Sequence, residues 1–216
     1  MKNIKAVLFD LDDTLFDRSK TFSQFCDYVI ESYFLEATNT SVALTVKEFM
    51  IRIDNNGYYD RNLFYHDVIE RWKLNCTVQQ LEEGWLEIIG KFAVAESHSL
   101  HALEHLSKSY ILGIVTNGSS LMQNRKIDGL GIRRYFNTII ISDDLGIRKP
   151  ETQIFIHACK TMNICPEDVA FVGDNYEIDI VGAEHAGLYP IFYNKYECRE
   201  PNSHSINRLD SLVSLL

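Results

Sequence analysis

The chain has 216 residues, of which 46% are hydrophobic and 24% are charged, and its formal net charge is −9. This composition excludes disordered, fibrous and collagen-like proteins, and the length allows one large domain or a core domain that carries an insertion. An acidic chain without a basic cluster is a poor candidate for binding nucleic acid polymers through their phosphates. An anionic substrate would therefore need a local positive site or a metal ion.

The spacing of the cysteines and the shortness of the apolar runs are typical of a protein in a reducing compartment. The five cysteines form no Cys-x-x-Cys pair, which argues against a disulfide framework and a thiolate zinc site. No apolar run approaches the roughly 18 residues that cross a bilayer. The N-terminal apolar stretch ends at Asp10, too early for a signal-peptide core. We expect a cytoplasmic protein without membrane contact, either a monomer or a homodimer.

Five short apolar runs predict the strands of a parallel sheet. The first run, at 5–9, stops abruptly at acidic residues, as a strand buried on both faces does. Four similar runs follow, the last of them opened by a proline: 110–115, 138–141, 169–172 and 190–193. Helical patterns separate these runs, at 121–130, 151–162 and 177–186. This alternation predicts an α/β fold with a doubly wound parallel sheet.

Turn residues mark the ends of the predicted helices. Pro150 and Pro166 both fit the first turn of a helix, where a missing N–H is tolerated. Gly187 fits the left-handed position that closes a helix.

Residues 17–95 follow a different pattern, because they contain no strand-like run and repeat apolar residues at helical spacing. Three such faces are visible: Phe22, Cys26, Val29 and Tyr33, then Phe64, Val68 and Trp72, then Leu81, Trp85, Ile88 and Ile89. A break at 54–57 has the composition of a turn. We interpret 17–95 as a helical cap inserted into a core formed by 1–16 and 96–216.

Four polar motifs follow the predicted strands or open a helix, where the sites of open α/β sheets lie. They are Asp10-Leu11-Asp12-Asp13-Thr14-Leu15, Thr116-Asn117-Gly118, Lys149-Pro150, and Gly173-Asp174 with Asp179. Asp10 and Asp12 flank one residue, so a tight bend can direct both carboxylates into one pocket. That proximity is tolerable only with a cation or a shared proton.

Together the motifs supply a nucleophile, a proton carrier, oxygen ligands for a hard cation and donors for anionic oxygens. Phosphoryl transfer needs this combination, because its catalysis is mostly positioning and charge neutralisation. Oxygen ligands favour Mg²⁺ over zinc.

With these four motifs in this order, the sequence resembles the haloacid dehalogenase superfamily of phosphatases and related enzymes. Within it, the chain is similar to the nucleotidase and N-acylneuraminate-9-phosphatase-like branch, whose cap follows the first strand. The segments 136–142, 146–150 and 182–187 match that subfamily as well. The resemblance implies a Rossmann-like core with an α-helical cap.

The resemblance also implies a role for each motif. Asp10 would attack phosphorus and form an aspartyl-phosphate, and Asp12 would protonate the leaving alcohol and then activate water. Mg²⁺ would be held by Asp10, the main-chain carbonyl of Asp12 and Asp174, with support from Asp179. Thr116 and Lys149 would hold phosphoryl oxygens, aided by the main chain at Asn117. Dehalogenases of the family lack an acid at the Asp12 position, so a phosphoester is favoured over a carbon–halogen bond.

Simpler interpretations exist for some of these residues. Asp10 and Asp12 could merely cap a strand end, although the other motifs make that a minor alternative. Asp179 could stabilise the dipole of its helix, which is compatible with a role at the metal. His98, His101 and His105 lie at helical spacing, and we interpret them as a solvated helix face rather than a metal site.

The expected function is a Mg²⁺-dependent phosphatase acting on a small phosphorylated metabolite, such as a nucleotide or a sugar phosphate. Arg18, Tyr59 and Arg61 are the candidate substrate contacts in the cap, because polar and aromatic groups there could bind a leaving group. Two alternatives are a phosphosugar mutase on the same fold and a phospho-accepting signalling module that does not turn over.

Overall fold

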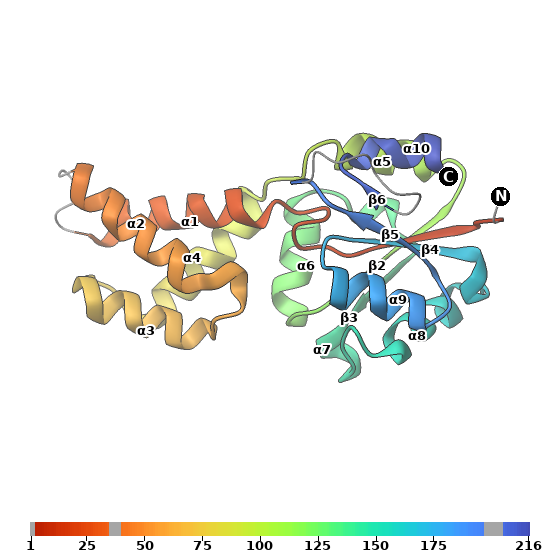
Figure 1. The fold of residues 1–216 in the computed structure, drawn as a ribbon. Coiled ribbons are helices and arrows are strands. Elements are labelled where there is room, and N and C mark those ends of the chain that lie inside the picture. Colours follow the sequence, from red (N-terminus) through yellow and green to blue (C-terminus); the bar gives the residue numbers. More distant parts are fainter. Residues whose placement is uncertain (1–2, 35–39, 197–204) are drawn as a thin grey trace. The chain divides into compact units, whose positions relative to one another are not determined.

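The computed structural model describes residues 3–34, 40–196 and 205–216, which divide into two units. One unit is formed by Met1–Asp17 with Ala95–Leu216, and the other is formed by Arg18–Val94. We describe each unit separately, the first as the core and the second as the cap (Figure 1).

The core contains a six-stranded, all-parallel sheet in the order β3-β2-β1-β4-β5-β6. The strands are β1 Ala6–Phe9, β2 Ile111–Thr116, β3 Thr138–Ile141, β4 Val169–Gly173, β5 Tyr189–Tyr193 and β6 Ser205–Ile206. β1 lies between β2 and β4, and Phe9 is in register with Ile114 on one side and Val172 on the other. The strand order changes direction at β1, so the loop after β1 lies at a topological switch point. This architecture confirms the predicted α/β fold.

Helices cover both faces of the sheet, with α5 and α10 on one face and α8 and α9 on the other (Figure 1). The helices of the core are α5 Ser99–Leu106, α6 Ser120–Gly129, α7 Ser142–Leu145, α8 Thr152–Met162, α9 Gly182–His185 and α10 Leu212–Leu215. Because both faces are covered, every residue of β1 and β4 is buried. Their continuous apolar runs follow from that burial.

Several element boundaries differ from the sequence prediction. The expected helix at 177–186 is a π-helix, Tyr176–Val181, followed by the short α9. Pro150 precedes α8, which begins at Thr152 after Glu151, so this proline does not lie in the first turn. β5 begins at Tyr189, one residue before Pro190. Pro166 opens a short 3₁₀ helix and Gly187 has a φ of +85°, as predicted.

The described part of the cap is helical, with α1 Arg18–Tyr33, α2 Thr40–Asp54, α3 Arg61–Trp72 and α4 Val78–Lys91. The apolar faces predicted for α1, α3 and α4 pack around an aromatic cluster. In it, the rings of Phe22 and Phe25 lie 5.9 and 5.4 Å from that of Trp85. The cap therefore has its own hydrophobic interior. Among the described residues of both units, no helix has the length and apolar character that a membrane span requires.

Candidate active site

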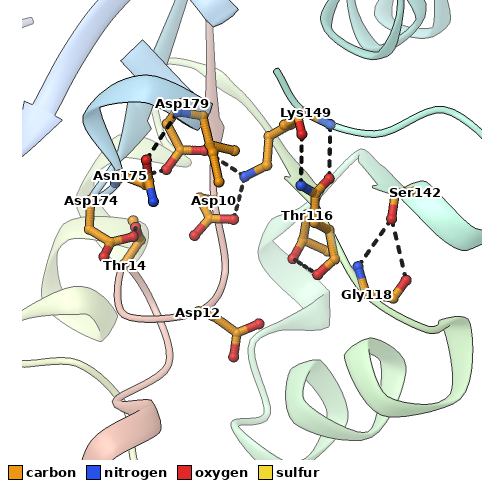
Figure 2. Close-up of polar contacts among 12 residues, drawn as sticks. Asp10, Asp12, Thr14, Thr116, Gly118, Ser142, Lys149, Asp174, Asn175 and Asp179 are labelled. Carbon is orange, nitrogen blue, oxygen red and sulfur yellow. Dashed lines mark hydrogen bonds and ion pairs between the residues drawn. The ribbon is translucent and has the colours of Figure 1, made fainter. Parts of the chain in front are cut away.

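Four loops of the core meet at the carboxyl-terminal edge of the sheet (Figure 2). Asp10 directly follows β1, Thr116 ends β2, and Asp174 directly follows β4. Since β1 lies between β2 and β4, these three residues come from adjacent strands. Lys149, from the loop before α8, completes the group. The strand order thus brings together residues that are more than 150 positions apart in the sequence.

Lys149 lies between two buried carboxylates. Its Nζ is 2.5 Å from Asp10 Oδ1 and 2.7 Å from Asp179 Oδ1. Asp179 also accepts a hydrogen bond from the backbone N–H of Asn175, at 3.1 Å, which fixes the turn after β4. Thr14 donates to Asp174 Oδ1 at 3.4 Å and thereby connects the loops after β1 and β4. The motifs that contain Asp10, Lys149 and Asp174 with Asp179 therefore form one connected group.

The burial of these groups changes their pKa values. The pKa of Asp10 is raised well above its ordinary value by burial and by the charges of Asp179 and Asp174, against the opposing charge of Lys149. Burial and the charge of Asp179 raise the pKa of Asp174 to about 7. Burial opposes the charge of Lys149, but Asp10 and Asp179 together raise its pKa. One ammonium would therefore offset only part of the negative charge that these carboxylates carry when ionised.

The same carboxylates fit a divalent cation. Asp10, Asp174 and Asp179 each offer an oxygen, and these oxygens lie within 4.8 Å of one another. Their ligand atoms are all oxygen, the kind that Mg²⁺ prefers. A cation there would offset the charge that raises the pKa of Asp10 and Asp174. The side chain of Asp12 points away from this group, so its part in metal binding would be limited to its main chain (Figure 2).

The loop after β2 is held by side chains rather than by regular structure. The amide of Asn117 bonds the main chain of Lys149 twice, donating at 3.0 Å to its carbonyl and accepting at 2.9 Å from its N–H. Ser142 accepts at 3.1 Å from the backbone N–H of Gly118, whose φ is +141°. The side chain of Asn117 is therefore occupied in positioning Lys149, which leaves its main chain for any contact with substrate.

Asp12 is held by two residues that the sequence interpretation did not identify. Lys126 Nζ lies 2.7 and 2.8 Å from the two carboxylate oxygens of Asp12, and Gln123 donates to Asp12 Oδ2 at 2.9 Å. Both residues lie on α6, three positions apart, directly after the Thr116-Asn117-Gly118 motif. Polar residues at i and i+3, on a helix face that turns toward the site, were the signal that could have found them.

The candidate contacts in the cap have partners within the cap. Arg18 is buried and bonds Asp54 twice, at 2.7 and 3.0 Å. Arg61 lies 3.0 Å from Asp54 and contacts the rings of Phe22, Phe64, Tyr65 and Trp85. The hydroxyl of Tyr59 donates to Asp67 at 2.6 Å. Arg18 is therefore a buried partner of Asp54 and not an exposed group of the cap. Substrate contact by Arg18, Tyr59 and Arg61 stays a prediction.

The fold and this group of residues define a Rossmann-like α/β protein with acids after β1 and β4. The model of the haloacid dehalogenase-like hydrolase family matches residues 4–187. The chain therefore belongs to the haloacid dehalogenase-like hydrolases, and it is an enzyme of that family. The family that the sequence resembles is thereby confirmed.

Relatives with assigned activities match nearly the whole chain. A glyceraldehyde 3-phosphate phosphatase of Pyrococcus furiosus is 30% identical, covering 100% of this chain and 94% of its own. A pyrimidine 5'-nucleotidase of Escherichia coli is 27% identical, covering 97% and 96%. An N-acylneuraminate-9-phosphatase of Rattus norvegicus is 25% identical, covering 87% and 81%. The predicted likeness to nucleotidases and N-acylneuraminate-9-phosphatases is confirmed.

A solved structure shows the same fold. The hydrolase YfnB of Bacillus subtilis, described as bound to magnesium, superposes with a TM-score of 0.73 at 21% identity. The match covers 99% of each chain.

Proposed function

We propose that the protein is a Mg²⁺-dependent phosphatase that hydrolyses a small phosphorylated metabolite through an aspartyl-phosphate on Asp10. The observation that carries this proposal is the buried contact of Lys149 with Asp10 and Asp179, beside Asp174, at the end of the central strand. It combines a carboxylate nucleophile, a cation for phosphoryl oxygens and oxygen ligands for a metal.

Asp10 supplies the nucleophile. One oxygen of its carboxylate forms a bond to phosphorus while the bond from phosphorus to the ester oxygen breaks. Lys149 is held next to that carboxylate, so its ammonium group can pair with a phosphoryl oxygen as substrate binds. Thr116 ends the adjacent strand β2 and would donate its hydroxyl to a second phosphoryl oxygen.

Asp10, Asp174 and the main-chain carbonyl of Asp12 would hold Mg²⁺, supported by Asp179. When bound, Mg²⁺ neutralises charge on these carboxylates and on the phosphoryl group. Asp10 must be ionised to attack, and burial among acids raises its pKa. A bound cation would restore the ionised form.

Asp12 would act as the general acid and general base. In the first half of the reaction it would give a proton to the leaving alkoxide, and in the second half it would take one from the attacking water. Water attacks phosphorus, the bond between phosphorus and Asp10 breaks, and inorganic phosphate leaves. Asp12 returns to its starting form, so one residue serves both halves.

The relatives support a small phosphomonoester as substrate. Their names specify glyceraldehyde 3-phosphate, pyrimidine 5'-nucleotides, N-acylneuraminate 9-phosphate and, in a Thermus thermophilus relative, phosphoserine. These compounds share a phosphate on a small organic alcohol and little else. We therefore propose the class of substrate and place discrimination among its members in the cap.

A panel of these four phosphate esters, assayed for released phosphate with Mg²⁺, tests the proposal. We expect many turnovers per site on at least one ester, loss of turnover with EDTA, and the same loss in Asp174→Ala. Asp10→Asn should retain less than about one per cent of wild-type activity, because loss of a covalent nucleophile costs several decades in rate. Asp144→Asn is a matched control, since it removes an exposed acid of α7.

Three outcomes would contradict the proposal. Full activity in EDTA would refute the requirement for a metal ion. Activity retained in Asp10→Asn would refute Asp10 as the nucleophile. A phosphate ester that is isomerised without release of phosphate would indicate a phosphosugar mutase instead.

A further inference from the structure

Two side chains of α6 join the proposed proton carrier to the proposed phosphate-binding hydroxyl. Gln123 Nε2 lies 2.9 Å from Asp12 Oδ2 and 2.6 Å from Thr116 Oγ1. Lys126 Nζ bonds both oxygens of Asp12 and lies 2.7 Å from Gln123 Oε1. Asp12, Thr116, Gln123 and Lys126 therefore form one hydrogen-bonded network. The mechanism above assigns no role to Gln123 or Lys126.

The burial of these two side chains calls for an explanation. Gln123 is 1% exposed and Lys126 is 7% exposed. A lysine is rarely buried unless it is paired, because the desolvation of its charge is costly. The ammonium of Lys126 also lies 5.2 Å from the centre of the Phe16 ring, so its surroundings are partly apolar. If α6 only had to cover the sheet, apolar residues would serve at both positions.

We propose that Gln123 and Lys126 are positioning residues for phosphoryl transfer: Lys126 holds the carboxylate of Asp12, and Gln123 holds that carboxylate together with the hydroxyl of Thr116. The inference rests on the proposed phosphatase function and adds two residues to the same site.

The donors and acceptors of the network fix the direction of the Thr116 hydroxyl. Lys126 can only donate, so the amide oxygen of Gln123 faces it and the amide nitrogen faces Asp12 and Thr116. That nitrogen can only donate, so Thr116 Oγ1 is the acceptor. The hydroxyl hydrogen of Thr116 then points elsewhere, and its contact with the carbonyl of Asn117 is long, at 3.5 Å. Thr116 is thereby prepared to donate to a phosphoryl oxygen.

The same network limits the movement of Asp12. Its carboxylate receives hydrogen bonds on both oxygens from residues of one helix, which prevents free rotation about the side chain. Gly118, in the loop between Thr116 and α6, packs closely on Gln123, since a Cβ there would lie 3.0 Å from Gln123 Cδ. Proton transfer needs hydrogen-bond reach, and a small misplacement of the carrier can lower the rate about 100-fold.

The test compares Lys126→Met with Arg125→Met, which removes an exposed cation at the preceding position of α6. The substrate is p-nitrophenyl phosphate, whose leaving group departs without a proton. Formation of the phosphoenzyme then needs Asp10 but not Asp12, whereas hydrolysis needs Asp12 as a base. In Lys126→Met we expect a first turnover close to that of wild type and a steady-state kcat lower by about 100-fold. Arg125→Met should match wild type in both.

A second measurement separates positioning from support of the fold. Adding Lys126→Met to Asp12→Asn should cause no further loss of kcat, because Lys126 acts through Asp12. Lys126→Arg should recover part of the lost kcat, because it keeps donors for the carboxylate. Equal losses in the first turnover and the steady state, or a further loss in the double variant, would overturn the proposal.

If Lys126→Met does not fold, Gln123→Met serves as the second variant. We expect the same loss of steady-state kcat together with a raised KM, since Thr116 is no longer held as a donor. An unchanged KM and kcat in Gln123→Met would overturn the proposal. The phosphatase function is judged independently, from turnover by wild type and its loss in Asp10→Asn.

Discussion

At the scale of single residues, the burial of Lys149 bears both on the stability of the protein and on the proposed reaction. Lys149 neutralises part of the charge of Asp10 and Asp179 in the protein without metal, and it would bind a phosphoryl oxygen during the reaction. A buried cation between two acids is held in place by charge on both sides. Without this cation, the repulsion between the acids should lower the stability of the folded protein.

Lys149→Met should therefore destabilise the metal-free protein. We expect the free energy of unfolding in EDTA to fall by about 3 kcal/mol, because buried acids lose their counter-charge. The loss should depend on pH. Acids whose pKa is raised in the folded state, such as Asp174 with a pKa of about 7, are protonated below that pH and do not repel. The penalty should thus appear as pH rises through about 7 and should be small at pH 5.

Chemical denaturation with and without Mg²⁺ measures this effect. Mg²⁺ should restore most of the lost stability, because it replaces the missing positive charge. Lys160→Met, an exposed lysine of α8, is the matched control and should show neither dependence. A loss that is equal at pH 5 and pH 8 and unaffected by Mg²⁺ would show that Lys149 contributes packing rather than charge.

At the scale of elements, the end of β4 and the π-helix after it form one side of the proposed metal site. Gly173 is the last residue of β4, and Asp179 returns to it from the π-helix. A Cβ on Gly173 would overlap the carboxylate of Asp179. The close approach of the two therefore requires glycine at this position.

Gly173→Ala should move Asp179 and weaken binding of Mg²⁺. We expect the Mg²⁺ concentration for half-maximal activity to rise by about 10- to 100-fold, as when a residue that supports a metal ligand is lost. Activity at saturating Mg²⁺ should recover in part, because Asp10, Asp12 and Asp174 remain. An unchanged Mg²⁺ dependence would show that Asp179 has no role at the metal.

At the scale of the whole molecule, the core is the part that its sequence predicts best. β1 and β4 are buried on both faces, and that burial produces the continuous apolar runs by which they were recognised. The acids after them mark the site, because their spacing has no common structural use. Elements with weaker signals were missed. β6 has only two residues, and no face was named for α2, although Val42, Val46, Phe49 and Ile53 repeat there at helical spacing.

Contacts between distant side chains could not be predicted. The pairing of Asp12 with Lys126 joins positions 114 residues apart, and only the strand order brings them together. The pairing of Arg18 with Asp54 is similar, because it depends on how α1 and α2 pack in the cap. Sequence patterns identify which residues are unusual for their surroundings. They do not identify the partner that makes each of them tolerable.

Discrimination among substrates depends on the cap in our proposal, and therefore on both units of the molecule. Arg61 is an unsuitable probe, because its pairing with Asp54 means that Arg61→Ala would also disturb the cap. Tyr59→Ala is more informative, with Tyr59→Phe as the control that removes only the hydrogen bond to Asp67. We expect Tyr59→Ala to change the preference between two natural phosphate esters by about tenfold, the size of one lost contact. Turnover of p-nitrophenyl phosphate should change little, and parallel losses on all substrates would assign Tyr59 to the fold of the cap.

The central claim is that Asp10 carries the phosphoryl group between the two halves of the reaction. The most direct measurement uses Asp12→Asn, which can form the phosphoenzyme from p-nitrophenyl phosphate but lacks the base to hydrolyse it. After acid quenching, peptide mass spectrometry locates the phosphoryl group. We expect one equivalent of p-nitrophenol per site and a phosphoryl group on Asp10, with both absent in the Asp10→Asn, Asp12→Asn double variant. A phosphoryl group on another residue, or no rapid release of p-nitrophenol, would contradict the account.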